Sequence, residues 1–125
     1  MLENKLQESI AANPFFRITG PVTYFDMLLL ESRCRMIITD SGGVQKESYF
    51  FRKPCLVLRP ESEWKELIEL GTATIVDADP LLIREAFERF HNQPPDHFPA
   101  IFGNGKAAEF ILGELVKFLP SGLVN

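Results

Sequence analysis

The chain has 125 residues, of which 46% are hydrophobic and 24% are charged, and its formal net charge at pH 7 is −4. This length and composition indicate one globular domain that is large enough to bury a single core. The acidic balance and the lack of a Lys/Arg cluster argue against a nucleic-acid partner, and no apolar run approaches the roughly 18 residues that span a bilayer. We therefore expect neither a nucleic acid nor a membrane as a partner.

The N-terminal segment is polar and amphipathic, without the basic start and apolar stretch of a signal peptide, so a cytoplasmic location is expected. Cys34 and Cys55 lie in or beside apolar segments and show no metal-ligand spacing, which predicts reduced, buried thiols. His91 and His97 have no carboxylate partner at a metal-binding spacing. The sequence therefore predicts neither a metal site nor another cofactor.

Short runs rich in β-forming residues alternate with helical patterns along the chain. The predicted strands are residues 15–19, 36–38, 55–58 and 73–76. This βαβα order is typical of the α/β class, and it predicts a Rossmann-like parallel sheet with flanking helices.

Capping residues mark the predicted helices. Thr23 and Asp26 form a capping box, and the helix that follows is apolar on nearly all sides, as a buried helix would be. Ser62, Asp79 and Asn104 are expected to cap three later helices. The later helices are predicted at residues 44–51, 64–70, 81–90 and from about 105 to 119. Each helix is expected to lie against the sheet, with one proline-rich loop at residues 93–99.

The segment from Asp40 to Glu47 directly follows a predicted strand and opens a helix. Ser41, Gly42 and Gly43 let backbone N–H groups approach an anion, and the first helical turn adds unpaired donors and the positive end of the dipole. Glu47 lies one turn beyond Gly43, where its carboxylate could accept hydrogen bonds from a sugar diol. Phosphate and diol together indicate a nucleotide, although the spacing alone also fits an ordinary strand-to-helix turn with a solvated glutamate.

Ligands of open α/β sheets bind beyond the carboxyl ends of the strands, where the glycine loop is expected to lie. Arg59 also follows a predicted strand, so its guanidinium could reach the same crevice; a solvated arginine before Pro60 is the alternative. Trp64 is expected to anchor its helix on the core, and lining of the sugar pocket is the alternative.

Several motifs in one order resemble the non-hydrolysing UDP-N-acetylglucosamine 2-epimerases, from about residue 20 to residue 118. The first is Thr39-Asp40-Ser41-Gly42-Gly43-Val44-Gln45-Lys46-Glu47. The later ones are Lys53-Pro54-Cys55-Leu56-Val57-Leu58-Arg59, then Glu63, then Glu69-Leu70-Gly71-Thr72, and finally Phe102-Gly103-Asn104-Gly105-Lys106-Ala107.

The resemblance implies a fold, a ligand and a set of site residues. Family members have two Rossmann-like domains in the GT-B arrangement, with UDP held chiefly by the C-terminal domain. The chain, residues 1–125, would be a single, incomplete C-terminal UDP-binding domain. The residues implied in binding UDP or a UDP-sugar are Ser41, Gly42 and Gly43 at the diphosphate, Glu47 at the ribose hydroxyls, and Gln45 and Arg59 in the cleft.

Family members invert C2 of the sugar by eliminating UDP and then adding it back, with acidic groups of the N-terminal domain moving protons. Those groups and the family's His-Arg-x-Glu-Asn motif are not found in the 125 residues, so no catalytic residue is assigned. We expect the chain by itself to show no 2-epimerase activity. Apolar surface left uncovered by missing elements also predicts a homo-oligomer.

Three other interpretations stay open at this point. A GT-B glycosyltransferase would also combine a glycine-rich turn with a ribose-binding glutamate. The segment Glu63-Trp64-Lys65-Glu66 resembles a branch of the epimerase family that acts on other UDP-2-acetamido sugars, including diacetamido uronates. A non-catalytic nucleotide-binding or interaction module is the third.

Overall fold

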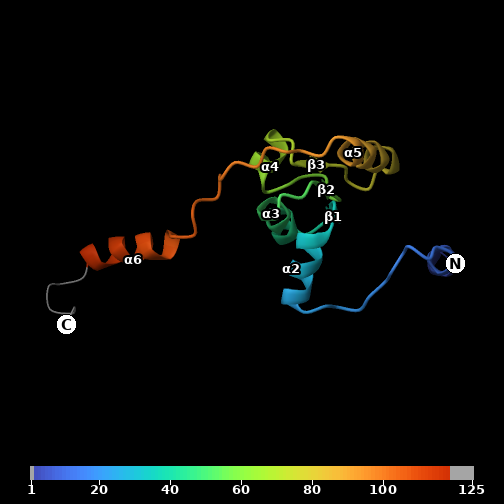
Figure 1. Cartoon of the computed structure of the whole chain (residues 1–125), viewed down its shortest axis with the longest axis horizontal. Helices are drawn as coiled ribbons and strands as arrows, with labels where there is room; N and C mark the ends of the chain where they lie inside the picture. The colour runs from blue at the N-terminus through green and yellow to red at the C-terminus, as the bar shows by residue number, and fades with distance from the viewer. Residues whose placement is uncertain (1, 119–125) are drawn as a thin grey trace.

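The computed structural model describes residues 2–118 (Figure 1). Helices and strands follow one another in the order α1 (Leu2–Ala11), α2 (Tyr24–Arg33), β1 (Ile37–Thr39), α3 (Gly42–Phe50), β2 (Cys55–Val57), α4 (Lys65–Glu69), β3 (Ala73–Ile75), α5 (Pro80–Asn92) and α6 (Ala107–Lys117). The α/β class and the parallel sheet with flanking helices are confirmed.

The sheet contains the three strands in the order β1-β2-β3, all parallel. Ile37 pairs with Cys55, and Cys55 pairs with Ala73, so the three strands begin in register and end together at one edge. The central strand β2 is fully buried, which is typical of a parallel strand covered on both faces. Three of the predicted strands are therefore confirmed within one residue at each end.

The core lies on both faces of this sheet. On one face, Cys55 and Val57 pack with Tyr49 of α3 and Leu67 of α4. On the other face, Leu56 packs with residues of the last strand's end and of α5, namely Val76, Ala86 and Phe90. The result is a three-layer sandwich, in which the sheet lies between helices on both faces.

The predicted strand at residues 15–19 is wrong. Phe15 donates its N–H to Asn13 Oδ1 at 3.0 Å, and Phe16 donates to the Asn13 carbonyl at 3.1 Å, so a turn follows α1 directly. The segment then runs without regular structure and leaves Phe15 94% exposed. β-forming residues make a strand only where a neighbouring strand supplies the hydrogen bonds, and none of the described strands lies beside this segment.

The prediction that α2 is buried on all sides is also wrong. Thr23 caps the helix as expected, because its hydroxyl accepts from the Asp26 N–H at 3.2 Å. The helix packs on α3, however, and presents its other sides to solvent, with Phe25 81% exposed. Its buried residue is Glu31.

The helices at the two ends extend away from the three-layer body (Figure 1). α1 was not predicted, and α6 has no buried residue, so the expectation that every helix lies against the sheet is wrong for α6. Lys106, not Asn104, precedes the first turn of α6; Asn104 instead accepts the Lys106 N–H at 3.1 Å. Leu119, included in the predicted helix, lies outside the described residues.

Capping explains the remaining helix bounds. Asp79 caps α5 as predicted and accepts from the N–H groups of Leu81 and Leu82. α4 is shorter than predicted, and the predicted cap at Ser62 is wrong: Trp64 precedes the first turn without a side-chain cap, and the Ser62 hydroxyl accepts the Trp64 N–H at 3.1 Å. α3 begins two residues earlier than predicted, at Gly42, which brings both glycines into its first turn.

Both cysteines are free, as predicted; Cys55 is buried, but Cys34 is only half-buried, so the prediction of a buried thiol is wrong there. Burial raises the pKa of the Cys55 thiol to about 11, which keeps it protonated and unreactive at neutral pH. Within residues 2–118, no helix combines the length and the apolar character that crossing a bilayer requires.

Candidate functional site

The glycine loop lies where the predicted fold requires it, between the carboxyl end of β1 and the start of α3. Ser41 caps α3: its hydroxyl accepts from the Val44 N–H at 3.4 Å, and its own N–H donates to Thr39 Oγ1 at 3.0 Å. Among the described residues, no hydrogen bond uses the N–H of Gly42 or Gly43. These donors point out of the first helical turn and are available to an anion.

Gly42 lies close to a charged pair. A Cβ at Gly42 would lie 3.2 Å from Glu63 Oε2 and 3.9 Å from Arg59 Nη1, so a larger residue has little space there. Arg59 and Glu63 form a two-point ion pair, with Nη2–Oε1 at 2.8 Å and Nη1–Oε2 at 3.1 Å. The pKa of the Glu63 carboxyl is lowered by its own backbone N–H and by Arg59. Arg59, predicted from its place after a strand, therefore borders the loop.

Trp64 ties the loop to the rest of the site, a role that the sequence did not reveal. Its indole N–H donates to the Gly42 carbonyl at 2.7 Å, and its ring packs against the core as predicted. Phe102 meets the Trp64 ring edge-on at 5.6 Å, and the Lys46 ammonium lies 4.6 Å from the centre of each ring. The motif that begins at Phe102 thus folds back on the glycine loop.

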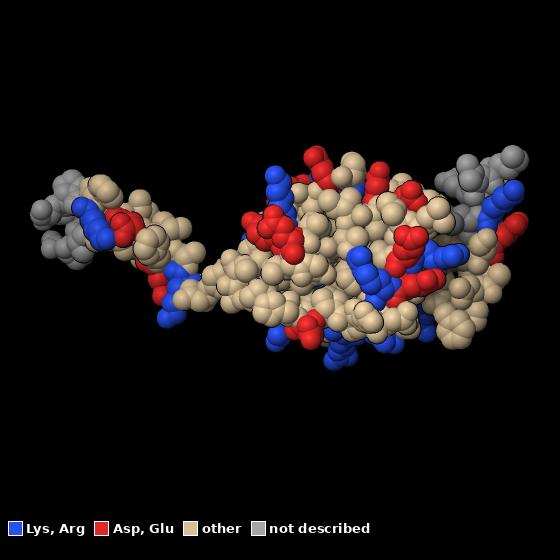
Figure 2. All heavy atoms as spheres, turned by 90° about the horizontal axis from the view of Figure 1, so that it is seen from above, with Lys and Arg blue, Asp and Glu red and all other residues tan. Residues whose placement is uncertain are grey.

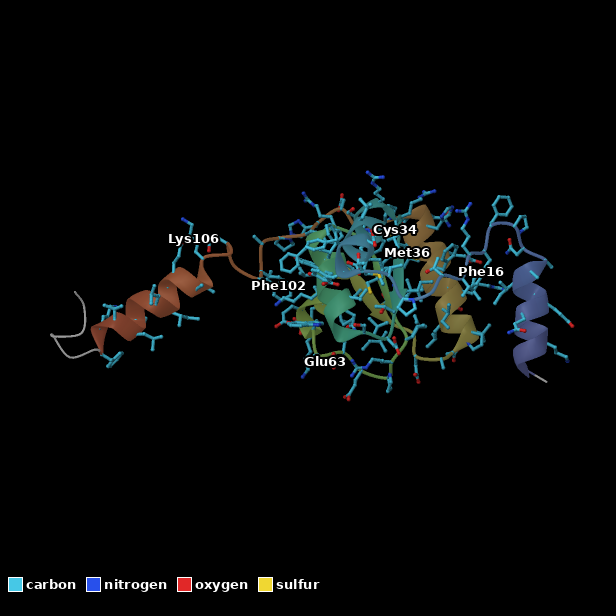
Figure 3. All side chains as sticks on the ribbon, turned by 90° about the horizontal axis from the view of Figure 1, so that it is seen from below. Phe16, Cys34, Met36, Glu63, Phe102 and Lys106 are labelled. Atoms are coloured by element: carbon cyan, nitrogen blue, oxygen red, sulfur yellow. The ribbon has the colours of Figure 1, made fainter. Side chains whose placement is uncertain are left out.

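Figure 3 shows where this last motif leaves the body, with Phe102 at its edge and Lys106 further out toward α6. Gly103 and Gly105 both have φ of +80°, a conformation that strongly favours glycine. The two glycines allow the chain to turn sharply after Phe102.

Gln45 is fully buried and lies behind the loop. Its side-chain oxygen accepts from the Ser62 hydroxyl at 2.6 Å, which joins α3 to the segment between β2 and α4. Its Nε2 has no hydrogen-bond partner among the described residues. In this structure Gln45 supports the segment that carries Arg59 and Trp64, and its predicted contact with a ligand stays a prediction.

Glu47 is half-buried on α3, one turn beyond Gly43. Two side chains of α2 approach it: the hydroxyl of Tyr24 and the carboxyl of Glu31. Burial, followed by the charge of Glu47, raises the pKa of Glu31. The diol-binding group predicted from the sequence therefore belongs to a small acidic cluster between α2 and α3.

Charged side chains of both signs are scattered over the face seen in Figure 2, with no continuous basic surface across it. Within residues 2–118, no group of three His, Cys, Asp or Glu side chains is placed to hold a metal ion. The donors that the glycine loop offers are thus backbone N–H groups and the Arg59 guanidinium. Such a set suits an anion such as a phosphate group.

Comparison with known proteins matches residues 2–116 to the family model described as UDP-N-acetylglucosamine 2-epimerase. A similar curated protein is the UDP-2,3-diacetamido-2,3-dideoxy-D-glucuronate 2-epimerase of Pseudomonas aeruginosa, which is 36% identical over 101 residues, 81% of this chain. The UDP-N-acetylglucosamine 2-epimerase of Methanocaldococcus jannaschii is 34% identical over 110 residues, 88% of this chain. The chain spans only 28% and 30% of these two relatives.

Solved structures give the same result. The M. jannaschii enzyme in complex with UDP-GlcNAc and UDP matches 93% of this chain with a TM-score of 0.79 and 34% identity. The Neisseria meningitidis UDP-GlcNAc 2-epimerase bound to UDP-GlcNAc also matches 93% of this chain, with a TM-score of 0.78 and 27% identity. The chain covers 32% and 33% of those two structures. Its fold therefore matches part of a larger protein.

Proposed function

The chain belongs to the UDP-N-acetylglucosamine 2-epimerase family, and we propose that its glycine loop forms the UDP-binding part of such an enzyme. The observation that carries this proposal is the geometry of Ser41, Gly42 and Gly43. The N–H groups of Gly42 and Gly43 are unpaired at the start of α3, beyond the carboxyl end of β1, and Ser41 caps this helix. Relatives of matching fold have been solved with UDP-GlcNAc or UDP.

Each proposed contact follows from a position in the structure. Ser41 and the unpaired N–H groups of Gly42 and Gly43 would bind the diphosphate, and Glu47 would accept hydrogen bonds from the two ribose hydroxyls. Arg59 borders Gly42, so its guanidinium would share its charge between Glu63 and a bound phosphate. Gln45 would act at the cleft, in part by holding the segment that carries Arg59.

We further propose that residues 1–125 are an incomplete C-terminal domain of a GT-B arrangement. In the reaction, the C2 proton and the UDP at C1 are eliminated; UDP then adds back at C1 while a proton is delivered to the opposite face of C2, which interconverts UDP-GlcNAc and UDP-ManNAc. This chain's residues would hold the UDP in place between the two steps, so that it re-adds without diffusing away. The acid–base groups would come from outside the site described here, and the chain alone would be inactive. The proposed location is the cytoplasm.

A second candidate is a 2-epimerase acting on another UDP-2-acetamido sugar. The observation that favours it is Trp64, part of the Glu63-Trp64-Lys65-Glu66 segment, which bonds to the Gly42 carbonyl beside the proposed diphosphate position. A relative named for a diacetamido uronate is 36% identical to this chain. Both candidates share the UDP contacts and differ in the sugar. The glycosyltransferase alternative gives way to the family match over residues 2–116.

Titrating the whole chain with UDP and following backbone amides by NMR tests the proposed site. We expect the amides of Ser41, Gly42 and Gly43 to shift most, with weak affinity in the high micromolar to millimolar range, about −4 to −6 kcal/mol, because one wall of a cleft excludes little water. Shifts concentrated around Arg33, Lys53 and His91 would contradict the proposal. Those residues line a separate cavity, which also adjoins Met36 just before β1.

Replacing Gly42 by alanine should weaken UDP binding by about tenfold, because the new methyl group needs space held by Glu63 and lies where a phosphate would approach. Gly113→Ala is the matched control. It makes the same change inside a helix, α6, where a Cβ meets nothing within 4 Å. The measurement is the UDP affinity of each variant from a titration. Thermal unfolding of both variants checks that the fold is intact. Equal affinities would show that the phosphate does not approach Gly42.

A further inference from the structure

Glu31 is a buried carboxyl group without a visible donor. It lies on α2, only 4% exposed, and among the described residues no hydrogen-bond donor reaches either of its oxygens. A buried, ionised carboxylate without partners is strongly unfavourable, so such a group ordinarily keeps its proton. A protonated Glu31 has one O–H to donate, and its acceptor must lie nearby.

An acceptor for this O–H is Glu47, across the contact between α2 and α3. A negative charge on Glu47 opposes a second charge on the buried Glu31. Burial favours the protonated form of Glu31, because the charged form would be removed from water. Glu47 is only half-buried. Glu47 is then a carboxylate that accepts a hydrogen bond from Glu31.

Tyr24 is a second side chain of α2 that approaches Glu47. It lies seven residues before Glu31, two turns along α2 on the same face, and its hydroxyl approaches the Glu47 carboxylate. Other titratable groups near Glu31 are few: the Cys34 thiol lies at the end of the same helix, and the Lys53 ammonium acts on that thiol. Two side chains of α2, Tyr24 and Glu31, thus approach the Glu47 carboxylate of α3.

We propose that Glu31 is a positioning residue of the nucleotide site, whose carboxylic acid donates a hydrogen bond to Glu47 and orients that carboxylate toward the ribose diol. This inference rests on the proposed function, because it assumes that Glu47 binds the ribose. Glu31 itself is buried and does not touch the nucleotide. With Glu31 bonded to one side of the carboxylate, the remaining lone pairs of Glu47 are free to accept from the ligand.

The arrangement makes UDP binding depend on pH. Burial and the neighbouring Glu47 raise the pKa of Glu31, so the folded chain holds this proton more tightly than the unfolded chain does. Stability is therefore lost as the pH rises from the usual glutamate pKa through the raised one. Over the same range, ionised Glu31 stops donating to Glu47 and repels it. UDP affinity should fall by about tenfold as one proton is lost.

Two variants of the whole chain test the role of Glu31. In Glu31→Gln the amide donates to Glu47 at every pH, so UDP affinity should stay within about twofold of its low-pH native value and lose the decline with pH. In Glu31→Leu no donor remains, so affinity should be about tenfold weaker at every pH, with a smaller preference for UDP over 2′-deoxy-UDP. The phosphates of UDP titrate equally in all three proteins, so the comparison isolates Glu31.

A parallel pH profile for the native chain and Glu31→Gln would overturn the proposal. Carbon-13 NMR of the side-chain carboxyl groups is a second measurement. It requires neither UDP nor that the Glu31→Leu variant folds. We expect Glu31 to titrate above the usual glutamate range in the native chain, and more nearly normally once Glu47→Gln removes the partner charge. If the Glu31 carboxyl titrates in the ordinary glutamate range, the hydrogen bond between Glu31 and Glu47 is overturned even if UDP binds. If Glu31 has a raised pKa but UDP does not bind, the result counts against the proposed function instead.

Discussion

Replacing Glu47 by alanine is expected to weaken UDP binding by about ten- to a hundredfold. A carboxylate that accepts hydrogen bonds from two ribose hydroxyls makes charge-assisted contacts of roughly 1.5–3 kcal/mol each. In the variant the two hydroxyls bond to water instead, so only part of this binding energy is lost. The measurement is a UDP titration of the whole chain by NMR, which remains quantitative for weak complexes. Glu85→Ala on α5 is the control, because it removes an exposed carboxylate of the same type outside the proposed site.

The same variant should lose the ability to distinguish UDP from 2′-deoxy-UDP, because the group that reads the diol is gone. Comparing two ligands with two proteins separates a lost ribose contact from damage to the fold. Damage weakens both ligands alike and leaves the native preference for UDP. If Glu47 is merely a solvated helix residue, Glu47→Ala will bind both ligands as the native chain does, with stability changed by no more than about 0.5 kcal/mol.

Leu56→Ala should lower the free energy of unfolding by about 2–5 kcal/mol, the largest change in stability expected here. Leu56 lies in the central strand and is fully buried against Val76, Ala86 and Phe90. Truncating it leaves a cavity that the sheet and α5 cannot close without moving β2. Urea denaturation followed by circular dichroism measures the change.

Leu81→Ala is the matched control for this prediction. Leu81 lies in the first turn of α5 and is 66% exposed, so removing the same atoms exposes no core and leaves no cavity. Its unfolding free energy should stay within about 0.5 kcal/mol of the native value. Equal losses in the two leucine variants would mean that α5 does not cover Leu56 in solution, and that the three-layer arrangement is wrong on that face.

Local chemistry made much of the fold predictable. The apolar runs before Asp40 and after Pro54 are short and bounded by turn residues, and they form β1 and β2. Thr23 and Asp79 predicted helix starts because capping depends on residues only two or three apart. The position of Ser41, Gly42 and Gly43 followed in turn, since the end of a parallel strand leads directly into the next helix.

Tertiary context explains what local patterns missed. Residues 15–19 have β-forming side chains but no strand beside them, and α2 and α6 are apolar yet largely uncovered. Hydrophobic periodicity shows which faces need a partner, not whether the partner lies within these 125 residues. The contact of Trp64 with the Gly42 carbonyl joins positions 22 residues apart, and the approach of Glu31 to Glu47 joins two helices, so neither was visible in spacing.

Trp64 has one more consequence, for spectroscopy. It is the only tryptophan in the sequence, so all indole fluorescence of the chain originates beside the glycine loop. Its ring N–H is bonded to the Gly42 carbonyl, and the Lys46 ammonium lies over its face, two interactions to which indole emission responds. An anion that binds and shifts the first turn of α3, or that binds the Lys46 ammonium, changes the environment of this one fluorophore. The native chain thus carries a built-in optical reporter at its proposed binding site, and no label needs to be introduced.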